Sequence, residues 1–227
     1  MTDSIHEGVG TKEHLDALLK RVKQPDTNNI NEGIPFEERL KQNISYRYLW
    51  AFEKIEAWRK EQGKKPEELH VIDVGSWTGM MSYLLSRAGY NVTAIDKEEA
   101  FLKVIQDHSP NVKIVQEDIM NIPSSLSNNY DIAIALEIIE HLTPDKEVLK
   151  SIYNILREQS LLILNTPIER NLICKEHVNF YDFYQLMDLF DTFTNDYKVC
   201  KLHKFKKHGE KNNLWGVVAK KGELDGR

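Results

Sequence analysis

Residues 69–79 read L-H-V-I-D-V-G-S-W-T-G. An apolar run with a single acid, Asp73, leads into a turn with glycines at Gly75 and Gly79, and a helical pattern begins at Met80. A buried parallel strand, a tight turn and a helix N-terminus in this order predict a cradle for a ligand. Glycine lets the backbone approach that ligand closely, and the first helical turn offers unpaired N–H groups with a partial positive charge.

The spacing of the glycines separates two kinds of nucleotide-binding turn. A dinucleotide fingerprint needs glycines at relative positions one, three and six, but counting from Gly75 the third and sixth positions hold Trp77 and Met80. The stretch resembles instead the first motif of class I S-adenosylmethionine-dependent methyltransferases, an acid followed by glycines at alternate positions. Trp77 stands where that motif has its middle glycine. The resemblance implies an S-adenosylmethionine site lined by Asp73, Gly75, Ser76, Trp77 and Gly79.

The composition is that of an ordinary globular protein. The chain has 227 residues, 41% hydrophobic and 29% charged, enough for one α/β domain with a helical extension. No apolar run approaches the ~18 residues of a membrane span, and residues 1–10 lack the apolar core of a signal peptide. The two cysteines, Cys174 and Cys200, form no metal or disulfide framework, so we expect a cytoplasmic protein with no membrane partner.

Strand and helix patterns alternate along most of the chain. Apolar runs predict seven strands, at residues 71–74, 92–95, 112–115, 130–136, 160–164, 197–205 and 214–219. Helical periodicity predicts helices at residues 80–88, 98–107, 143–156 and 181–190. This order predicts an α/β fold, a doubly wound, Rossmann-like, mostly parallel sheet that binds ligands at the carboxyl ends of its strands. The resemblance to the methyltransferases implies that the last strand is antiparallel.

The sequence of residues 1–65 predicts a helical N-terminal extension, and residues 66–227 are expected to form the cofactor-binding domain. We expect the two parts to form a single compact unit. Its helical patterns lie at residues 12–22 and 36–60. The aromatic residues of the second pattern either dock that helix on the domain, the interpretation we favour, or cover the cofactor or substrate. Arg47 is either a contact for the carboxylate of the cofactor or a surface arginine.

Two acids follow the second and third predicted strands. Asp96 comes about 20 residues after the glycine turn, where a carboxylate can accept both hydrogen bonds from a ribose diol. The alternatives for Asp96 are a solvated acid and a helix N-cap. Asp118 follows the third strand, and the resemblance implies that it receives the adenine amino group with a backbone amide, that of Ile119, alongside. For Asp118 the alternative is a cap or turn acid.

Residues 137–141 read E-I-I-E-H and follow the fourth predicted strand. If they begin a helical turn, Glu137, Glu140 and His141 lie at i, i+3 and i+4 on one face. His177 follows the fifth strand and can lie at the same edge of the sheet. Two carboxylates and two imidazoles make a candidate site for a divalent metal such as Mg²⁺, Mn²⁺, Fe²⁺, Co²⁺ or Zn²⁺.

This segment resembles the Glu-x-x-Glu-His of two methyltransferase families, the small-RNA 3′-terminal ribose 2′-O-methyltransferases and the ubiquinone-pathway O-methyltransferases. The resemblance implies that Glu137, Glu140, His141 and His177 hold a metal that lowers the pKa of the attacking hydroxyl. Two alternatives stay open. In the one we favour, no metal is used, Glu137 shapes the cofactor pocket, and the catalytic residues are Glu140 and His141, the latter as a general base. In the other, both histidines are structural.

Four functions are compatible with these motifs to different degrees. The first is an S-adenosylmethionine-dependent methyltransferase that O-methylates a small molecule or a sugar. The second is a metal-dependent RNA 2′-O-methyltransferase, against which the net charge of −5 weighs. The third is a nicotinamide-dependent oxidoreductase, which the glycine spacing opposes. The fourth is a non-catalytic binding module that keeps the fold, in which Trp77 blocks the cradle.

Lysines gather in the predicted closing hairpin, at Lys201, Lys204, Lys206, Lys207 and Lys211. They either meet a phosphate or an RNA backbone or protect the edge of the sheet from aggregation. We favour the second interpretation, because no aromatic stacking platform accompanies these lysines.

Overall fold

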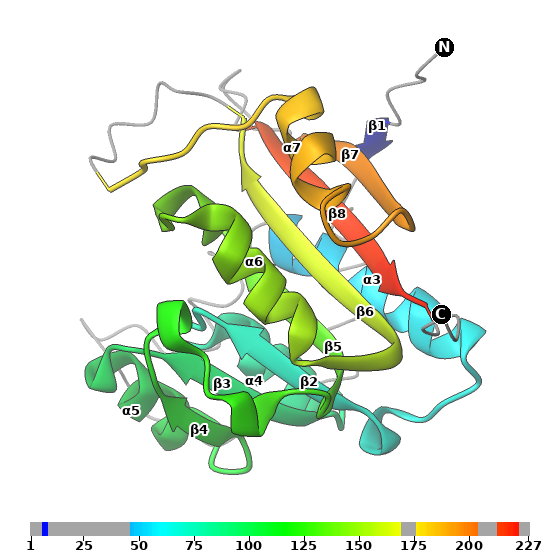
Figure 1. Ribbon diagram of the computed structural model, residues 1–227. Coiled ribbons are helices and arrows are strands. Elements are labelled where there is room, and N and C mark those ends of the chain that lie inside the picture. Colours follow the sequence, from blue (N-terminus) through cyan, green and yellow to red (C-terminus); the bar gives the residue numbers. More distant parts are fainter. Residues whose placement is uncertain (1–5, 9–45, 169–175, 204–212, 223–227) are drawn as a thin grey trace, which may run out of the picture. The chain divides into compact units, whose positions relative to one another are not determined.

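The computed structural model describes residues 6–8, 46–168, 176–203 and 213–222 (Figure 1). The chain divides into two compact units. The first unit is Gly10–Ile119, and the second unit is Met1–Val9 together with Met120–Arg227. The boundary expected between residues 65 and 66 falls inside the first unit, and the expected division at that point stays a prediction.

The first unit contains three parallel strands in the order β2–β3–β4. They are β2 (His70–Val74), β3 (Asn91–Asp96) and β4 (Lys113–Gln116). Four of the five residues of β2 are buried, as expected of a parallel strand that is covered on both faces. Because Asp96 pairs with Gln116, the carboxyl ends of β3 and β4 lie at one edge. All three strands were expected from the sequence to within two residues.

Within the described residues, three α-helices accompany these strands, namely α3 (Tyr46–Glu61), α4 (Met80–Arg87) and α5 (Glu99–His108). Trp50 and Trp58 of α3 are buried at 0% and 4% exposure, which confirms for these two residues that the aromatics dock the helix. Gly89, with a φ angle of 97°, follows the end of α4, where glycine commonly stops a helix. The helical patterns expected at residues 12–22 and 36–45 lie outside the described residues.

A buried polar network fixes α3 to the start of β3. Arg59 donates to both carboxylate oxygens of Glu56 at 2.9 Å, and the hydroxyl of Tyr90 donates to the same carboxylate at 2.6 Å. Burial and the neighbouring Glu56 carboxylate raise the pKa of Tyr90, so the phenol stays protonated and remains a donor. The network therefore holds the helix ahead of the sheet in one orientation.

The second unit contains five strands in the order β1–β7–β8–β6–β5. They are β1 (His6–Gly8), β5 (Tyr130–Leu136), β6 (Leu156–Pro167), β7 (Tyr197–His203) and β8 (Asn213–Lys221). β8 is antiparallel to both of its neighbours, whereas β5 and β6 are parallel. This confirms the mostly parallel, Rossmann-like α/β fold with an antiparallel last strand. Strand β1, which pairs in parallel with β7, was not expected.

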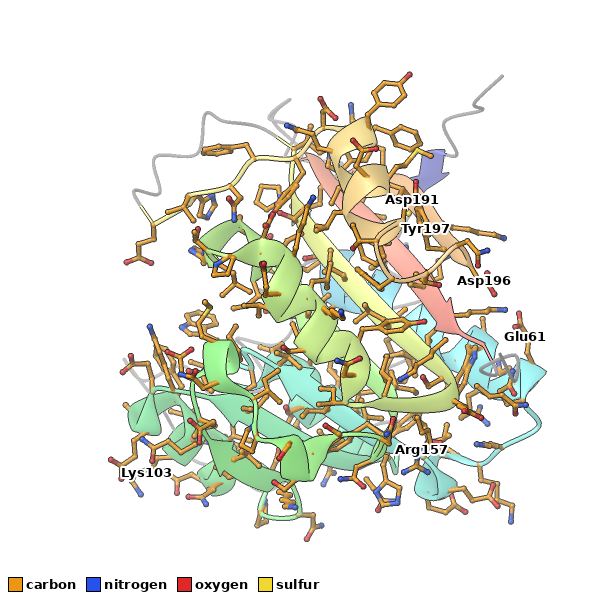
Figure 2. The ribbon with its side chains drawn as sticks, in the orientation of Figure 1. Glu61, Lys103, Arg157, Asp191, Asp196 and Tyr197 are labelled. Carbon is orange, nitrogen blue, oxygen red and sulfur yellow. The ribbon has the colours of Figure 1, made fainter. Side chains whose placement is uncertain are left out.

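The described part of the second unit has two α-helices, α6 (Asp145–Asn154) and α7 (Phe183–Phe190). Helix α6 runs along β6, and α7 lies beside β7 (Figure 1). The hydroxyl of Tyr197 donates to Asp191 at 2.7 Å, which joins the start of β7 to the end of α7 (Figure 2). The expected helix over residues 143–156 is too long, because the chain turns at Ile155 and Leu156 already begins β6.

No helix in the described part of the chain is both long enough and apolar enough to cross a membrane.

Candidate functional site

The glycine turn after β2 folds back over the end of β3. The backbone N–H groups of Gly75 and Ser76 both donate to the carbonyl oxygen of Ile95, at 2.9 and 3.1 Å. Gly75, Trp77 and Gly79 have positive φ angles of 67°, 47° and 76°. Left-handed backbone at alternate residues curls the chain tightly, and only glycine adopts it without steric cost. The turn thus has the local shape that its motif predicts.

Gly79 is required for packing as well as for backbone shape. A Cβ atom at this position would lie 2.3 Å from Cγ1 of Ile105 in α5. Because no side chain intervenes, α4, which begins at Met80, packs closely against α5. Gly79 therefore determines where the N-terminus of α4 and its unpaired N–H groups lie.

Asp73, the acid of the motif, is buried near the end of β2. Its Oδ2 atom accepts hydrogen bonds from the backbone N–H of Ser82 at 3.0 Å and from the Ser82 hydroxyl at 2.7 Å. Burial raises the pKa of the Asp73 carboxyl to about 6, and the bonds from Ser82 oppose that rise. These bonds tie α4 to β2, so Asp73 helps to form the turn, and its contact with a cofactor stays a prediction.

Asp96 ends β3 beside the turn. Its Oδ2 atom accepts a hydrogen bond from the backbone N–H of Trp77 at 2.9 Å, and Oδ1 accepts one from the N–H of Glu98 at 3.0 Å. A carboxylate has about four acceptor positions, so these two bonds leave room for a diol. The amide contacts fix the carboxylate in one orientation at the carboxyl end of the strand.

Trp77 and Phe101 form an aromatic pair at this edge of the first unit. The indole is 55% exposed. Its ring centroid lies 6.0 Å from that of Phe101 in α5, at an interplanar angle of 71°. Phe101 was not singled out in the sequence, because its position on the helix becomes relevant only once α5 packs beside the turn.

Asp118 and Ile119 follow β4 at the same edge of the first unit. The backbone N–H of Glu117 donates to the carbonyl oxygen of Asp96 at 3.0 Å, which brings this segment beside the end of β3. Ile119 is buried and begins a short 3₁₀ turn, Ile119–Asn121. The structure therefore brings Asp96, Asp118 and Ile119 to neighbouring strand ends, as expected.

Arg47 lies near the start of α3 and is engaged locally. Its Nη2 atom donates to the hydroxyl of Tyr48 at 3.2 Å, and its guanidinium lies 4.8 Å from the centre of the Tyr48 ring. The expected contact with a cofactor carboxylate stays a prediction.

The structure corrects the expected helical turn at Glu137. Glu137 has a φ angle of 54°, and the helical residues are the short 3₁₀ turn Ile139–His141. The backbone N–H of Glu137 donates to the side-chain oxygen of Asn165 at 2.9 Å and to its carbonyl oxygen at 3.0 Å. These bonds to the end of β6 hold Glu137 in a left-handed conformation. Glu137, Glu140 and His141 therefore do not share one helical face.

Glu140, His141 and His177 nevertheless converge in the second unit. One ligand atom from each residue lies within 4.8 Å of the others. Glu140 is buried at 1% exposure, and its Oε2 atom accepts a hydrogen bond from the hydroxyl of Thr166 at 3.1 Å. The two imidazole rings are 4.7 Å apart and nearly perpendicular, at 82°. Three of the four expected metal ligands thus come together, and Glu137 is not among them.

The two histidines have different surroundings. The carbonyl oxygen of Glu176 can only accept, so Nδ1 of His141 donates to it at 3.1 Å, and Nε2 is the ring nitrogen left for a metal or a substrate. Burial and the neighbouring His141 lower the pKa of His177, while Glu137 and Glu176 oppose that change. A neutral imidazole is the form that binds a metal or accepts a proton.

Residues 176–181 are docked on the 3₁₀ turn by hydrogen bonds that the sequence did not predict. The N–H groups of Val178 and Asn179 donate to the carbonyl oxygen of Glu140 at 2.8 and 3.0 Å. The side-chain amide of Asn179 donates to the carbonyl oxygens of Ile139 and Leu142. These bonds place His177 beside His141, although 35 residues separate them in the sequence.

A pocket of about 430 Å³ adjoins the same segment. It is formed by the start of α6, residues 178–181 and one face of α7. Asp145 and Asp188 contribute carboxylates, and Val178 and Phe180 contribute apolar surface. The hydroxyl of Tyr181 donates to Asp145 at 2.7 Å, which orients this wall of the pocket.

Comparison with known proteins identifies the kind of domain. Residues 72–164 match the family model described as a methyltransferase domain. A ubiquinone biosynthesis O-methyltransferase of Rickettsia conorii is 22% identical over 167 residues, which cover 70% of this chain and 50% of the relative. One of Coxiella burnetii is 28% identical over 106 residues, covering 45% of this chain and 44% of the relative. The chain thus spans about half the length of these curated relatives.

Solved structures share the fold at low sequence identity. The plantazolicin methyltransferase BpumL, in complex with S-adenosylhomocysteine, has a TM-score of 0.61 and 15% identity, covering 92% of this chain and 98% of that one. A SAM-dependent methyltransferase from Archaeoglobus fulgidus has a TM-score of 0.56 and 18% identity, covering 74% of this chain and 94% of that one. At these identities the likeness concerns the fold alone.

Proposed function

We propose that the chain is an S-adenosylmethionine-dependent methyltransferase that transfers a methyl group to a hydroxyl oxygen of a small molecule. The match of residues 72–164 to a methyltransferase domain supports this proposal. The observation that carries the proposal is the convergence of Glu140, His141 and His177. A hydroxyl must lose its proton as it attacks, and the hydrogen bond from Nδ1 to Glu176 holds the His141 ring in one orientation, with Nε2 as the proposed proton acceptor. The O-methyltransferase names of the relatives favour oxygen as the acceptor atom.

The proposed reaction is an in-line displacement at the sulfonium. The acceptor oxygen forms a bond to the methyl carbon, and the carbon–sulfur bond breaks with its electron pair on sulfur. When no metal is bound at His141, the hydroxyl proton passes to Nε2 of that residue. The products are a methyl ether and S-adenosylhomocysteine. Because the donor is already activated, the protein contributes alignment, exclusion of water and removal of the proton.

The first unit supplies the proposed contacts to the donor. Asp96 accepts the ribose hydroxyls, Asp118 receives the adenine amino group, and the backbone of the glycine turn borders the methionine part. Two backbone amides hold the Asp96 carboxylate in one orientation and leave acceptor positions open for a diol. Both facts support the assignment of Asp96 to the ribose. Arg47 of the first unit remains a candidate for the carboxylate of the cofactor, and the role of Glu137 in the cofactor pocket stays a prediction.

A divalent metal fits the donor set of the second unit. One carboxylate and two imidazoles suit Mn²⁺, Fe²⁺, Co²⁺ or Zn²⁺ better than Mg²⁺, which prefers oxygen ligands. The lowered pKa of His177 supports the proposal, because it keeps the imidazole in its ligating form. A bound metal would lower the pKa of an acceptor hydroxyl held beside it. In its absence, His141 alone serves as the base.

The pocket beside residues 178–181 is the proposed acceptor site. It borders the segment that carries His177, and its volume of about 430 Å³ is that of a site for a small molecule rather than a polymer. Its mixed lining of carboxylates and apolar side chains suits an acceptor with both a hydrophobic body and polar substituents.

Calorimetric titration with S-adenosylhomocysteine, with NAD as the control ligand, tests the donor assignment. We expect micromolar binding of the first and none of the second. Asp96→Ala should weaken binding by about tenfold or more, because the ribose hydroxyls lose a charged acceptor. Absence of binding to the unmodified chain would favour a non-catalytic module over an enzyme.

Titration with Mn²⁺ alone tests the metal assignment without knowledge of the acceptor. We expect binding to the unmodified chain and its loss in His177→Ala. Equal affinity of both proteins would remove His177 from the ligand set, and no binding to either would favour the metal-free base.

A further inference from the structure

The side chain of Trp77 is exposed on a strained backbone. Its indole is 55% exposed, whereas Trp50 and Trp58 are 0% and 4% exposed. Its φ angle of 47° is one that a residue with a Cβ adopts only at a steric cost. A strained residue that presents a large apolar ring to solvent points to a role for the ring beyond packing.

The backbone of Trp77 is bonded to the carboxylate assigned to the ribose. The N–H of Trp77 donates to Oδ2 of Asp96 at 2.9 Å, so the residue that bears the indole is bonded directly to that acid. Phe101, in the first turns of α5 and five positions after Asp96, lies edge-on to the indole at 6.0 Å. The indole that meets Phe101 therefore belongs to a residue that is bonded through its backbone to the end of β3.

We propose that Trp77 and Phe101 form an aromatic wall that packs against the adenosine part of the donor and provides part of its affinity. The proposal rests on the proposed binding of S-adenosylmethionine. It adds that the side chain of Trp77 contacts the donor at the position where the motif has a glycine without a side chain. The purine and the ribose present apolar faces next to a diol, and an exposed ring beside a diol-binding acid matches that surface. Stacking of a base on an aromatic ring is a recurrent source of affinity for nucleosides.

The strain makes the proposal testable, because stability and binding should move in opposite directions. Trp77→Gly relieves the left-handed strain and removes the ring, so the free protein should melt at a higher temperature while S-adenosylhomocysteine binds about tenfold more weakly. Trp77→Phe keeps an aromatic ring and should bind within about threefold of the original. If Trp77→Gly binds as tightly as the original or more tightly, the wall does not exist, and the indole obstructs the cradle or is indifferent to it.

Phe101→Leu is the matched test of the second ring. It keeps apolar volume but removes the ring that faces Trp77, so binding should weaken by a smaller factor, about threefold. Unchanged affinity in this variant would exclude Phe101 from the wall.

Tryptophan fluorescence gives a readout that a purely structural role would not move. Adenosine and S-adenosylhomocysteine should both change the emission of the unmodified chain, since Trp77 is 55% exposed, whereas Trp50 and Trp58 are buried and Trp215, in the second unit, is only partly exposed. The change should vanish in Trp77→Phe although the ligand still binds by calorimetry. An emission change that persists in Trp77→Phe would overturn the proposal. If the unmodified chain binds no S-adenosylhomocysteine at all, the proposed function itself fails, which is a different result.

Discussion

At the glycine turn, the collision of a side chain and the strain of the backbone can be measured separately. Gly79→Ala places a methyl group 2.3 Å from Cγ1 of Ile105 on a backbone with a φ angle of 76°. We expect the free energy of unfolding to fall by about 3 kcal/mol, because the collision adds to the left-handed strain. Chemical denaturation measures this change.

Gly63→Ala is the control for that variant. Gly63 has a φ angle of 64°, but among the described residues no atom beyond its two chain neighbours lies within 4 Å of the position that its Cβ would occupy. Its substitution should cost only the backbone strain, about 1 kcal/mol. Equal losses in the two variants would mean that Ile105 moves aside without cost.

Asp73 makes stability depend on pH in an unusual direction for an acid. Its pKa is about 6 in the folded chain and 3.8 as an unperturbed group, so the folded state holds the proton more tightly. Its contribution is therefore fully present below pH 4 and is lost as the pH rises through 6. Asp73→Asn removes this titration, so its stability relative to the original should improve by about 3 kcal/mol between pH 4 and pH 7.

Thermal melts of Asp73→Asn and of the original protein between pH 4 and pH 7 measure the difference in stability. The other titrating groups are the same in the two proteins, so their contributions cancel. Ser82→Ala is a second check, because loss of the single hydrogen bond from the Ser82 hydroxyl should raise the pKa of Asp73 further and steepen the pH dependence. A constant difference between Asp73→Asn and the original would mean that the carboxyl stays ionised throughout.

Among the elements, residues 176–181 depend most clearly on long-range hydrogen bonds. Asn179→Ala removes the side-chain donors to Ile139 and Leu142, so we expect a loss of about 1–3 kcal/mol in stability and weaker Mn²⁺ binding as His177 leaves His141. Denaturation and calorimetry measure the two effects. Val178→Ala, at a residue that is 57% exposed, is the control and should change neither. Metal affinity that survives in Asn179→Ala would show that the docking is not needed.

The strands of the second unit differ in how well the sequence predicts them. Strand β5 was expected over its full length, because a run of seven residues that are nearly all apolar is typical of a buried strand. The start of β6 was missed because Arg157, Glu158 and Gln159 are polar and at least partly exposed, so they show no apolar strand pattern. Gln159 also has a φ angle of 53°, which a regular strand does not have. Strand β1 is three residues at an edge, too short to show a period.

The candidate site was predictable to the extent that it depends on strand ends. Asp96 and Asp118 follow apolar strands, and neighbouring parallel strands end at the same edge, so their proximity followed from the sequence. The conformation of Glu137 did not, because it depends on Asn165, 28 positions later in the chain. Neither did the Trp77–Phe101 pair, which requires the helix packing that Gly79 allows.

For the whole molecule, the two proposed ligands should act on different parts of the chain. S-adenosylhomocysteine should slow amide hydrogen exchange in the first unit, at the glycine turn and at residues 96–98, because the ligand occupies that edge. Mn²⁺ should slow exchange at residues 139–141 and 177–179 of the second unit. Amide hydrogen exchange, followed by mass spectrometry with each ligand added separately, measures the protection of these residues. NAD is the control ligand. Protection by Mn²⁺ confined to the first unit would contradict the metal assignment.

The two amide contacts of the Asp96 carboxylate have a consequence for the rate of binding. Both contacts exist in the free protein, so the side chain is already ordered before a donor arrives and little rearrangement should precede association. Substitutions that alter only the surface of the cradle should then leave the association rate nearly constant and act on the lifetime of the complex. The tightness of this site would be decided by how slowly the spent donor leaves, and product release is a step that limits turnover in many enzymes.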